Sequence, residues 1–136
     1  MTPTHIALLG LIAWTILLVV SLGLFRVGLA LSSGRRANSF SPSGDDVGAF
    51  GQRLTRAHAN CYEVLPALGL ILVYAIATNQ TATTDGLALG LLGARIVQSL
   101  IHIASTSVPM VLLRFTAFGA QLGIAGFWLL QLGGLI

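Results

Sequence analysis

The sequence predicts an all-α integral membrane protein built as a bundle of four transmembrane helices. Hydrophobic residues make up 55% of the 136 residues, and the mean hydropathy is +0.89. Only 8% of the residues are charged, whereas a soluble domain carries about 25%. Four apolar stretches are long enough to cross a bilayer, which takes about 20 residues. We therefore expect a single membrane domain that covers residues 1–136.

The first two spans are predicted from hydropathy and length. Residues 5–25 are almost entirely apolar and form the first span. The second helix covers residues 48–78: it begins in solution and enters the membrane near Cys61. Asp45 or Asp46, just before this helix, is expected to cap its start. A carboxylate there can accept a hydrogen bond from a backbone N–H that has no partner within the helix.

The third and fourth spans are predicted over residues 86–105 and 112–136. Thr83, Thr84 and Asp85 stand just before the third span, and such residues are typical of a helix N-cap. Turn-forming Ser, Pro and Gly residues fill the long connection between the first and second spans. This connection is therefore expected to be a loop rather than a second domain.

The positions of the arginines predict the orientation. The chain has seven arginines and no lysine, and five of them lie between the first two spans, namely Arg26, Arg35, Arg36, Arg53 and Arg56. Arg114 lies between the third and fourth spans, which a four-span chain puts on the same side. The positive-inside rule therefore places the first loop in the cytoplasm and both termini on the opposite side.

A polar stripe runs along the second helix. Arg56, Asn60 and Glu63 are spaced i, i+4 and i+7, which places them on one face of a helix. Arg53 extends the stripe by one turn. Because an ionisable residue inside a span is costly, such a residue indicates a functional site.

The third and fourth spans carry polar residues as well. A stripe at i, i+3, i+4 and i+7 is formed by Arg95, Gln98, Ser99 and His102. The fourth span has Gln121 in its interior. Lipid cannot satisfy these groups, so they must face each other, a neighbouring subunit or a water-filled cavity. Interhelical hydrogen bonds are the simplest role for Gln98, Ser99 and Gln121.

Two electrostatic expectations follow. Glu63 is the one acid, and Arg95 the one base, that lies clearly inside a span. We therefore expect the two side chains to form an ion pair within the bundle. Arg53, Arg56 and Arg114 outnumber the acids at one membrane face. An anionic small-molecule ligand is therefore expected, because a guanidinium can hold a carboxylate through two hydrogen bonds. The alternative ligands are anionic lipid headgroups.

Several kinds of chemistry are not expected. No cluster of His, Cys, Asp and Glu has metal-ligand spacing, so no metal site is predicted. The arginines lie beside or inside apolar runs, so nucleic acid is not an expected partner. Cys61 is the single cysteine, and it is expected to be a small buried residue. A transporter or channel fits poorly, because no span is broken.

The segment Arg56-Ala-His-Ala-Asn-Cys-Tyr-Glu63, with Pro66 three residues on, resembles the helix-two signature of the MAPEG family, the membrane-associated proteins in eicosanoid and glutathione metabolism. That signature reads Arg-Ala-His/Gln-x-Asn-x-x-Glu-x-x-Pro. The chain length, the four spans and the basic first loop agree with the family. The resemblance implies a homotrimer of four-helix bundles, in contact with membrane lipids, that binds glutathione between subunits near the cytoplasmic face.

The resemblance also assigns roles to residues. It implies that glutathione is bound by Arg56, Asn60 and Glu63 of the second helix, and that Arg95 corresponds to the helix-three arginine. Arg53 and His102, which lie on the same two stripes, complete the candidate glutathione-binding residues. Arg114 corresponds to the arginine that stabilises the thiolate in glutathione-activating members and is the expected catalytic residue. Arg35 or Arg36 would contact a glutathione carboxylate, and spacing does not decide between them.

The chain departs from the best-known MAPEG enzymes at three positions. Those enzymes place a tyrosine three or seven residues after the helix-three arginine, where this chain has Gln98 and His102. Phe115 follows Arg114, where the prostaglandin-forming member has a serine. The expected function is a glutathione transferase, a lipid-hydroperoxide peroxidase or both, acting on lipophilic substrates. The alternative is a non-enzymatic lipid- or ligand-binding membrane protein of the same fold.

Overall fold

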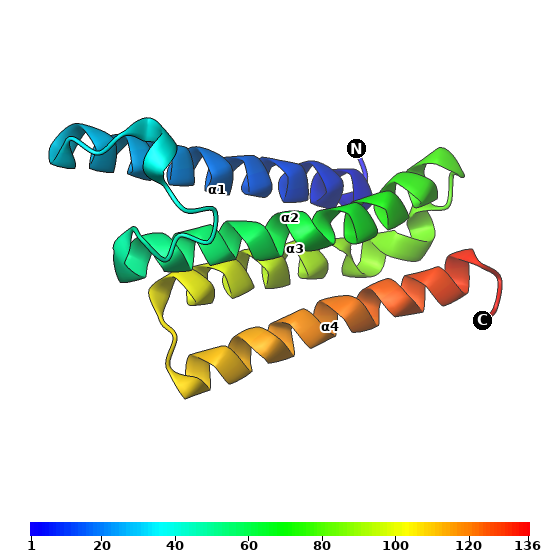
Figure 1. Cartoon of the computed structure of the whole chain (residues 1–136). Coiled ribbons are helices and arrows are strands. Elements are labelled where there is room, and N and C mark those ends of the chain that lie inside the picture. The colour runs from blue at the N-terminus through cyan, green and yellow to red at the C-terminus, as the bar shows by residue number, and fades with distance from the viewer.

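The computed structural model describes all residues 1–136 and contains four α-helices and no strand. In chain order they are α1 (Pro3–Ser33), α2 (Gly48–Ala77), α3 (Thr81–Ala104) and α4 (Val108–Leu132), with a short 3-10 turn, η1 (Ala37–Ser39), between α1 and α2. All four helices are long and apolar enough to cross a membrane. The predicted all-α fold of a multi-pass integral membrane protein is confirmed (Figure 1).

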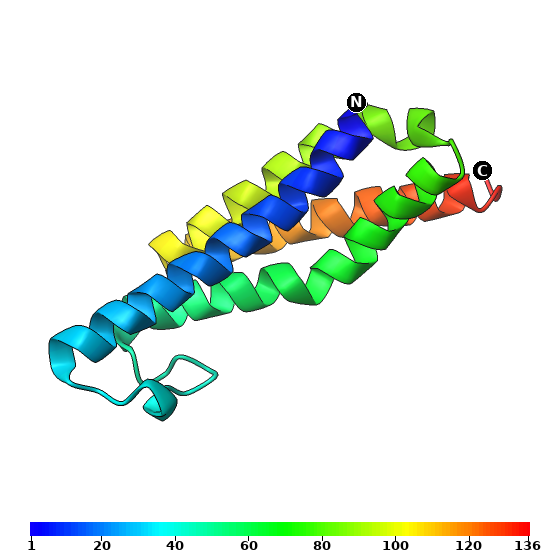
Figure 2. The same cartoon turned by 90° about the horizontal axis from the view of Figure 1, so that it is seen from above.

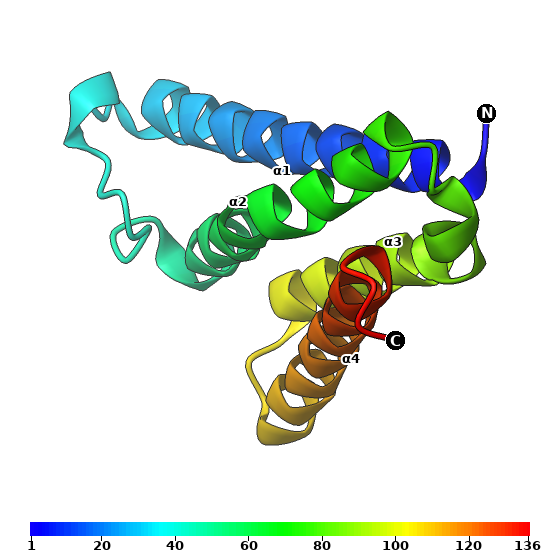
Figure 3. The same ribbon diagram turned by 90° about the vertical axis from the view of Figure 1, so that its right-hand side faces the viewer.

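The helices run up and down, so that both termini and the α2–α3 turn lie at one end (Figures 1 and 2). The α1–α2 loop and the α3–α4 connection lie at the other end, which we call the loop end. α1, α2 and α3 pack against one another, whereas α4 packs on α3 and barely meets α2. Figure 3 shows α4 leaning away from α1 and α2. The fourth helix is therefore held mainly through α3.

Three helices have ends that differ from the predicted spans, and one of them is α3, which covers Thr81–Ala104 rather than residues 86–105. α1 continues past Phe25 to Ser33 and ends at Gly34, whose φ of 66° is the left-handed conformation that often terminates helices. α4 begins at Val108 rather than at residue 112, with a proline in its first turn, and it ends at Leu132 rather than at residue 136. Proline is favoured in a first turn because its missing N–H would be unpaired there in any case.

The predicted cap of α3 is wrong. α3 begins at Thr81, so Thr84 and Asp85 lie inside the helix and not before it. The Thr4 and Thr84 hydroxyl oxygens are 2.6 Å apart, and an Asp85 carboxylate oxygen accepts both the backbone N–H of Thr4 (2.9 Å) and its hydroxyl (2.6 Å). These residues join the beginnings of α1 and α3 instead.

The predicted cap of α2 is also wrong. Its N-cap residue is Val47, and no side chain caps it. Asp46 instead accepts the backbone N–H of Ser41 at 2.9 Å and forms an ion pair with Arg35. The Ser41 N–H, together with the Arg35 guanidinium, lowers the pKa of the Asp46 carboxyl. Asp46 therefore organises the loop rather than the helix.

Most of the apolar core lies in the half of the bundle that carries the termini. Its largest member is Trp128 of α4, which is fully buried with Leu72 of α2 and Leu91 of α3. A smaller buried cluster towards the loop end contains Leu18, Leu22, Leu54 and Cys61. The predicted burial of Cys61 is confirmed. The main core occupies the half of the bundle that carries the termini, and the polar stripes of α2 and α3 lie in the loop-end half.

Candidate functional site

A polar cavity of about 230 Å³ lies at the loop end between α2, α3 and α4. Its walls are Gln52, Arg53, Arg56, His102, Thr106, Val111 and Arg114. We call it the arginine pocket. Four predicted site residues, Arg53, Arg56, His102 and Arg114, thus come from three helices to one place. No acid lines the pocket, so its charge is strongly positive.

A second cavity of about 210 Å³ adjoins the first. It is lined by Asn60, Gln98, Val111, Arg114, Phe115 and Phe118, and we call it the aromatic pocket. Val111 and Arg114 line both cavities, so Arg114 stands at the boundary between a cationic space and an aromatic one. This arrangement places one guanidinium where a polar ligand and an apolar ligand can meet.

The three arginines of the arginine pocket differ in how they are held. The Arg53 Nε–H donates to the backbone oxygen of Ile103 at 2.7 Å, which joins α2 to the end of α3. The guanidinium groups of Arg56 and Arg114 make no hydrogen bond or ion pair within the chain, and Arg56 is exposed. Of these two, Arg114 also lines the aromatic pocket, where a guanidinium attracts anions more strongly than in bulk water.

Arg95 is buried, with 3% of its surface exposed, and it is held by Asn60. Its Nη1 donates to the Asn60 side-chain oxygen at 2.9 Å, and Gln98 Nε2 donates to the same oxygen at 3.1 Å. The stripe of α3 is thus bonded to the stripe of α2. A neutral amide, rather than a carboxylate, is the partner of this cation.

The expected ion pair between Glu63 and Arg95 is therefore wrong. The one ion pair in the chain joins Arg35 and Asp46, and Glu63 is exposed and lines neither pocket. Asn60 and Glu63 lie about 60° apart around the helix at 100° per residue. Asn60 is bonded to α3, whereas Glu63 is exposed and makes no hydrogen bond or ion pair with α3.

Gln98 and Gln121 form the interhelical hydrogen bonds expected of them. Gln121 Nε2 donates to Gln98 Oε1 at 2.9 Å, and also to the backbone oxygen of Ala117 at 2.9 Å. With the bond from Gln98 to Asn60, this makes a continuous polar chain from α2 through α3 to α4. Ser99 lies 3.2 Å from the sulfur of Cys61 and donates to the backbone oxygen of Arg95.

Two buried atoms of this network have no partner in the chain, Arg95 Nη2 and Gln121 Oε1. The Arg95 guanidinium carbon is 5.9 Å from the centre of the Phe118 ring, a distance at which a cation is attracted to an aromatic face. Arg95 is thus a buried cation beside the aromatic pocket, and no acid of this chain pairs with it.

Some residues of the two pockets were not predicted. Gln52 lies one turn before Arg56, and Val111 and Phe118 lie one turn on either side of Arg114. The helical spacing of three or four residues that predicted the polar stripes would also have identified these three positions. Thr106, in the α3–α4 connection, has the same signal, because it continues the stripe of the third span four residues after His102.

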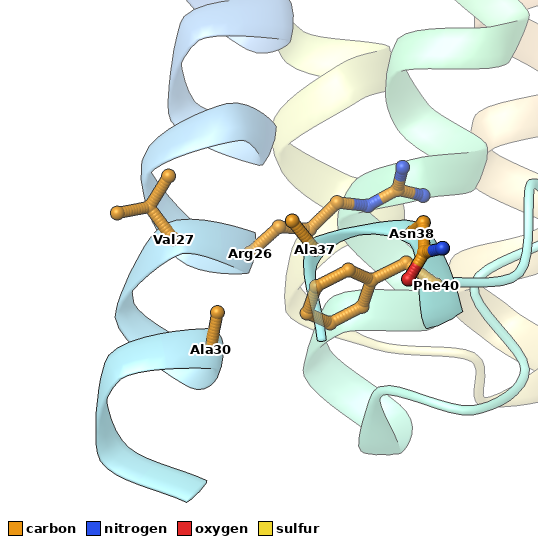
Figure 4. Close-up of a pocket in the computed structure, with 6 residues that line it drawn as sticks. All are labelled: Arg26, Val27, Ala30, Ala37, Asn38 and Phe40. Carbon is orange, nitrogen blue, oxygen red and sulfur yellow. The ribbon is translucent and has the colours of Figure 1, made fainter. Parts of the chain in front are cut away.

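Arg35 and Arg36 line neither pocket. A separate cavity of about 230 Å³ lies where the loop folds back on α1, and its walls are Arg26, Val27, Ala30, Ala37, Asn38 and Phe40 (Figure 4). Arg26 donates to the backbone oxygen of Ser41 at 3.2 Å. The guanidinium of Arg35 lies 4.5 Å from the Phe40 ring. Arg26 and Arg35 thus hold the loop in place.

Comparison with known proteins identifies the family of the chain. The MAPEG family model matches residues 4–134, which is nearly the whole chain and includes all four helices and both pockets. No curated protein and no solved structure matches the chain. The family match rests on the full length of the bundle and not on the helix-two signature alone, and we conclude that this chain belongs to the MAPEG family.

Proposed function

We propose that the chain is a glutathione-dependent membrane enzyme, a glutathione transferase, a lipid-hydroperoxide peroxidase or both. The MAPEG family includes both activities, and its members generally use glutathione. The observation that carries the proposal is the position of Arg114 between the arginine pocket and the aromatic pocket. Glutathione needs the first environment and a lipophilic substrate needs the second.

The arginine pocket suits the charged part of glutathione. The tripeptide carries two carboxylates, and a guanidinium binds a carboxylate with two parallel hydrogen bonds. Arg56 is exposed and unpaired, so it is available for such a bond. Arg53 adds positive charge, although one of its donors already serves Ile103. We assign glutathione binding to these two residues.

Arg114 suits the reactive sulfur. A cysteine thiol has a pKa of about 8.5 and is mostly protonated at neutral pH. A guanidinium beside the sulfur favours the thiolate, and it acts more strongly where the aromatic wall excludes water. A lipophilic acceptor would arrive from the bilayer past Phe115, which is largely exposed on the surface of α4. We therefore assign thiolate stabilisation to Arg114.

Asn60, Glu63 and Arg95 fit less direct roles. Asn60 lines the aromatic pocket, and both hydrogen bonds to its side chain use the oxygen, so its NH₂ group is free for a ligand. Arg95 keeps one unpartnered nitrogen. Glu63 is exposed on α2, where an ionised group in a membrane needs a partner. A homotrimer, in which a second copy covers this face, would supply one.

The arginines support an orientation for this enzyme. All seven arginines lie in the loop-end half of their helix or in the α1–α2 loop. The positive-inside rule then places the loop end and the arginine pocket at the cytoplasmic face, with both termini on the opposite side. Glutathione would enter from water, and the lipophilic substrate would enter from the bilayer.

Titration of the purified, detergent-solubilised protein with glutathione tests the proposal, with thiolate absorbance as the readout. Thiolate should form at neutral pH, it should be lost in Arg114→Ala, and it should be retained in part by Arg114→Lys, which keeps the positive charge. Absence of binding at millimolar glutathione would contradict the proposal. Native mass spectrometry in several mild detergents tests the trimer, and a dominant monomer in all of them would count against it.

The non-enzymatic alternative has one observation in its favour. Gln98 stands at a position where the best-known enzymes have tyrosine, and its side chain is fully engaged with Asn60 and Gln121. A lipid- or ligand-binding protein would carry anionic lipid through purification and turn over neither 1-chloro-2,4-dinitrobenzene nor cumene hydroperoxide. Turnover that disappears in Arg114→Ala would exclude this alternative.

A further inference from the structure

His102 is the one polar residue of the α3 stripe that no group of the chain binds. Its side chain is buried, with 9% of its surface exposed, and it lines the arginine pocket. Arg95, Gln98 and Ser99 on the same stripe all have hydrogen-bond partners. Its ring nitrogens make no hydrogen bond within the chain and are not among the buried side-chain atoms that lack a partner, so they are accessible from the pocket. The imidazole is therefore left for whatever fills the pocket.

The charged groups that face His102 all have the same sign. Arg53 and Arg56 face it from α2 and Arg114 faces it from α4, and no acid lines the pocket. A neutral imidazole has one ring nitrogen that donates and one that accepts, so it can take up a proton on one side and release it on the other. Because like charges repel, three guanidinium groups oppose a lasting imidazolium.

We propose that His102 carries the thiol proton of glutathione to the leaving oxygen of a lipid hydroperoxide. This inference rests on the proposed function and deepens it. In the first step the S–H bond breaks, the sulfur keeps the electron pair beside Arg114, and a new N–H bond forms on His102. The brief imidazolium that results suits a proton that is passed on at once.

In the second step the thiolate attacks the terminal oxygen of the hydroperoxide. An S–O bond forms, the O–O bond breaks, and the proton on His102 moves to the departing alkoxide, which leaves as an alcohol. Sulfur is oxidised to a sulfenic acid and the peroxide is reduced. The thiol of a second glutathione then condenses with the sulfenic acid, giving the disulfide and water. His102 ends the cycle neutral.

This assignment separates the two reactions proposed for the site. Conjugation to 1-chloro-2,4-dinitrobenzene releases chloride, which needs no proton. At pH 9 glutathione is already largely ionised, because its thiol pKa is about 8.5. Conjugation at pH 9 therefore needs no proton carrier, whereas hydroperoxide reduction still needs a proton for the alkoxide. Substitution of a residue with only a structural role would lower the rates of both reactions by similar factors.

The experiment compares His102→Gln with His5→Gln in the detergent-solubilised protein. Glutamine can form hydrogen bonds but cannot carry a proton at these pH values. His5 is a matched histidine at the opposite end of the bundle, where its ring lies 2.9 Å from the Thr2 hydroxyl. His102→Gln should lower kcat for cumene hydroperoxide by about 100-fold, a typical effect of losing acid–base catalysis. At saturating glutathione, where a contribution of His102 to binding no longer limits the rate, kcat for conjugation at pH 9 and the thiolate absorbance there should stay within about threefold of wild type, since neither needs the proton carrier. His5→Gln should change neither.

Equal losses in both reactions, or an unchanged kcat for the hydroperoxide, would overturn the inference. A wild-type protein that conjugates glutathione but does not reduce the hydroperoxide would also overturn it and leave the glutathione chemistry standing. A wild type that binds no glutathione would remove the proposed function as well.

If His102→Gln does not fold, the wild type in D₂O replaces it. Hydroperoxide reduction should slow by about twofold or more, because a proton is in transfer, while conjugation at high pD should not slow. Equal isotope effects in the two reactions would contradict the inference.

Discussion

Asn60 of α2 holds the guanidinium of Arg95 of α3 through its side-chain oxygen, at 2.9 Å from Arg95 Nη1. The same oxygen accepts a hydrogen bond from Gln98. A buried cation is thus joined to the neighbouring helix by a neutral amide, while the acid on the same helix, Glu63, is exposed. This bond and that of Arg53 to Ile103 are polar connections between α2 and α3, and Asn60 lines the aromatic pocket.

A double-mutant cycle should show that Asn60 and Arg95 are coupled. Asn60→Leu leaves a buried guanidinium without its acceptor, so it should lower the free energy of unfolding by about 1.5–3 kcal/mol. In a chain that already carries Arg95→Met, Asn60→Leu should lower the free energy of unfolding much less. Glu63→Gln and Arg95→Met should instead be additive within about 0.5 kcal/mol. Unfolding in detergent, followed by circular dichroism, measures both cycles, and a coupling between Glu63 and Arg95 that exceeds the Asn60 coupling would contradict this account.

Gln98 and Gln121 should be coupled as well, because their 2.9 Å hydrogen bond joins α3 to α4. Interhelical hydrogen bonds in membrane proteins average about 0.6 kcal/mol, with a maximum of about 1.7. Gln98→Leu and Gln121→Leu should therefore give a coupling energy in that range. The measurement is the same unfolding experiment, and strictly additive effects would show that the bond contributes nothing to stability.

Arg114→Ala should lower turnover while leaving glutathione affinity nearly unchanged. Loss of one preorganised donor at a site of developing charge lowers kcat by about 10²–10³. Binding should change little, because the carboxylates of glutathione are assigned to other arginines. Steady-state kinetics with 1-chloro-2,4-dinitrobenzene and a glutathione binding isotherm measure the two quantities. A kcat within about twofold of wild type would refute the catalytic assignment, since no such donor would have been lost.

Arg56→Ala should show the opposite pattern. The guanidinium is exposed at the end of the α2 stripe, where it is assigned to a glutathione carboxylate. Its removal should raise the KM for glutathione about tenfold with kcat unchanged, which is the behaviour expected when ground state and transition state lose the same contact. Arg56→Lys, which keeps the charge but not the paired hydrogen bonds, should lie between. A fall in kcat as large as that of Arg114→Ala would show that Arg56 acts in the chemical step.

The α1–α2 loop should lose its order at low pH. The Ser41 N–H and the Arg35 guanidinium lower the pKa of Asp46 below its ordinary value of 3.8. A carboxyl with a depressed native pKa stabilises the fold above its unfolded pKa, and this contribution is lost as the pH falls through the native pKa. Amide protection over residues 34–47, which is the intrinsic exchange rate at a given pH divided by the observed rate, should thus be high at pH 5 and lower below pH 3.8.

Asp46→Asn should lower amide protection in this loop at pH 5 and reduce the dependence of that protection on pH. A smaller dependence should remain, because hydrogen bonds from the Ser41 and Ser43 hydroxyls lower the pKa of Asp45 as well. Exchange in Asp46→Asn that matched wild type at every pH would show that the ion pair does not hold the loop.

The number of helices and the faces that carry polar residues could be read from the sequence, because both depend on local properties. Hydropathy over about 20 residues identifies a span, and the 3.6-residue period assigns side chains to faces. These two rules placed Arg53, Arg56 and His102 on polar stripes, and the excess of arginines over acids at one membrane face added Arg114; the structure gathers all four around one pocket. They also predicted the hydrogen-bonding role of Gln98 and Gln121.

The choice of partners was decided by the tertiary structure. Arg95 could have met Glu63 or Asn60, which differ by about 60° around α2, and only the packing of α2 on α3 selects Asn60. Asp46 and Asp85 are of a residue type that often caps helices, and both lie near a predicted helix start. In the structure Asp46 instead pairs with Arg35, and Asp85 accepts a hydrogen bond from Thr4. Local sequence states which groups need a partner, but the rotation and the approach of whole helices determine which partner comes within hydrogen-bonding distance.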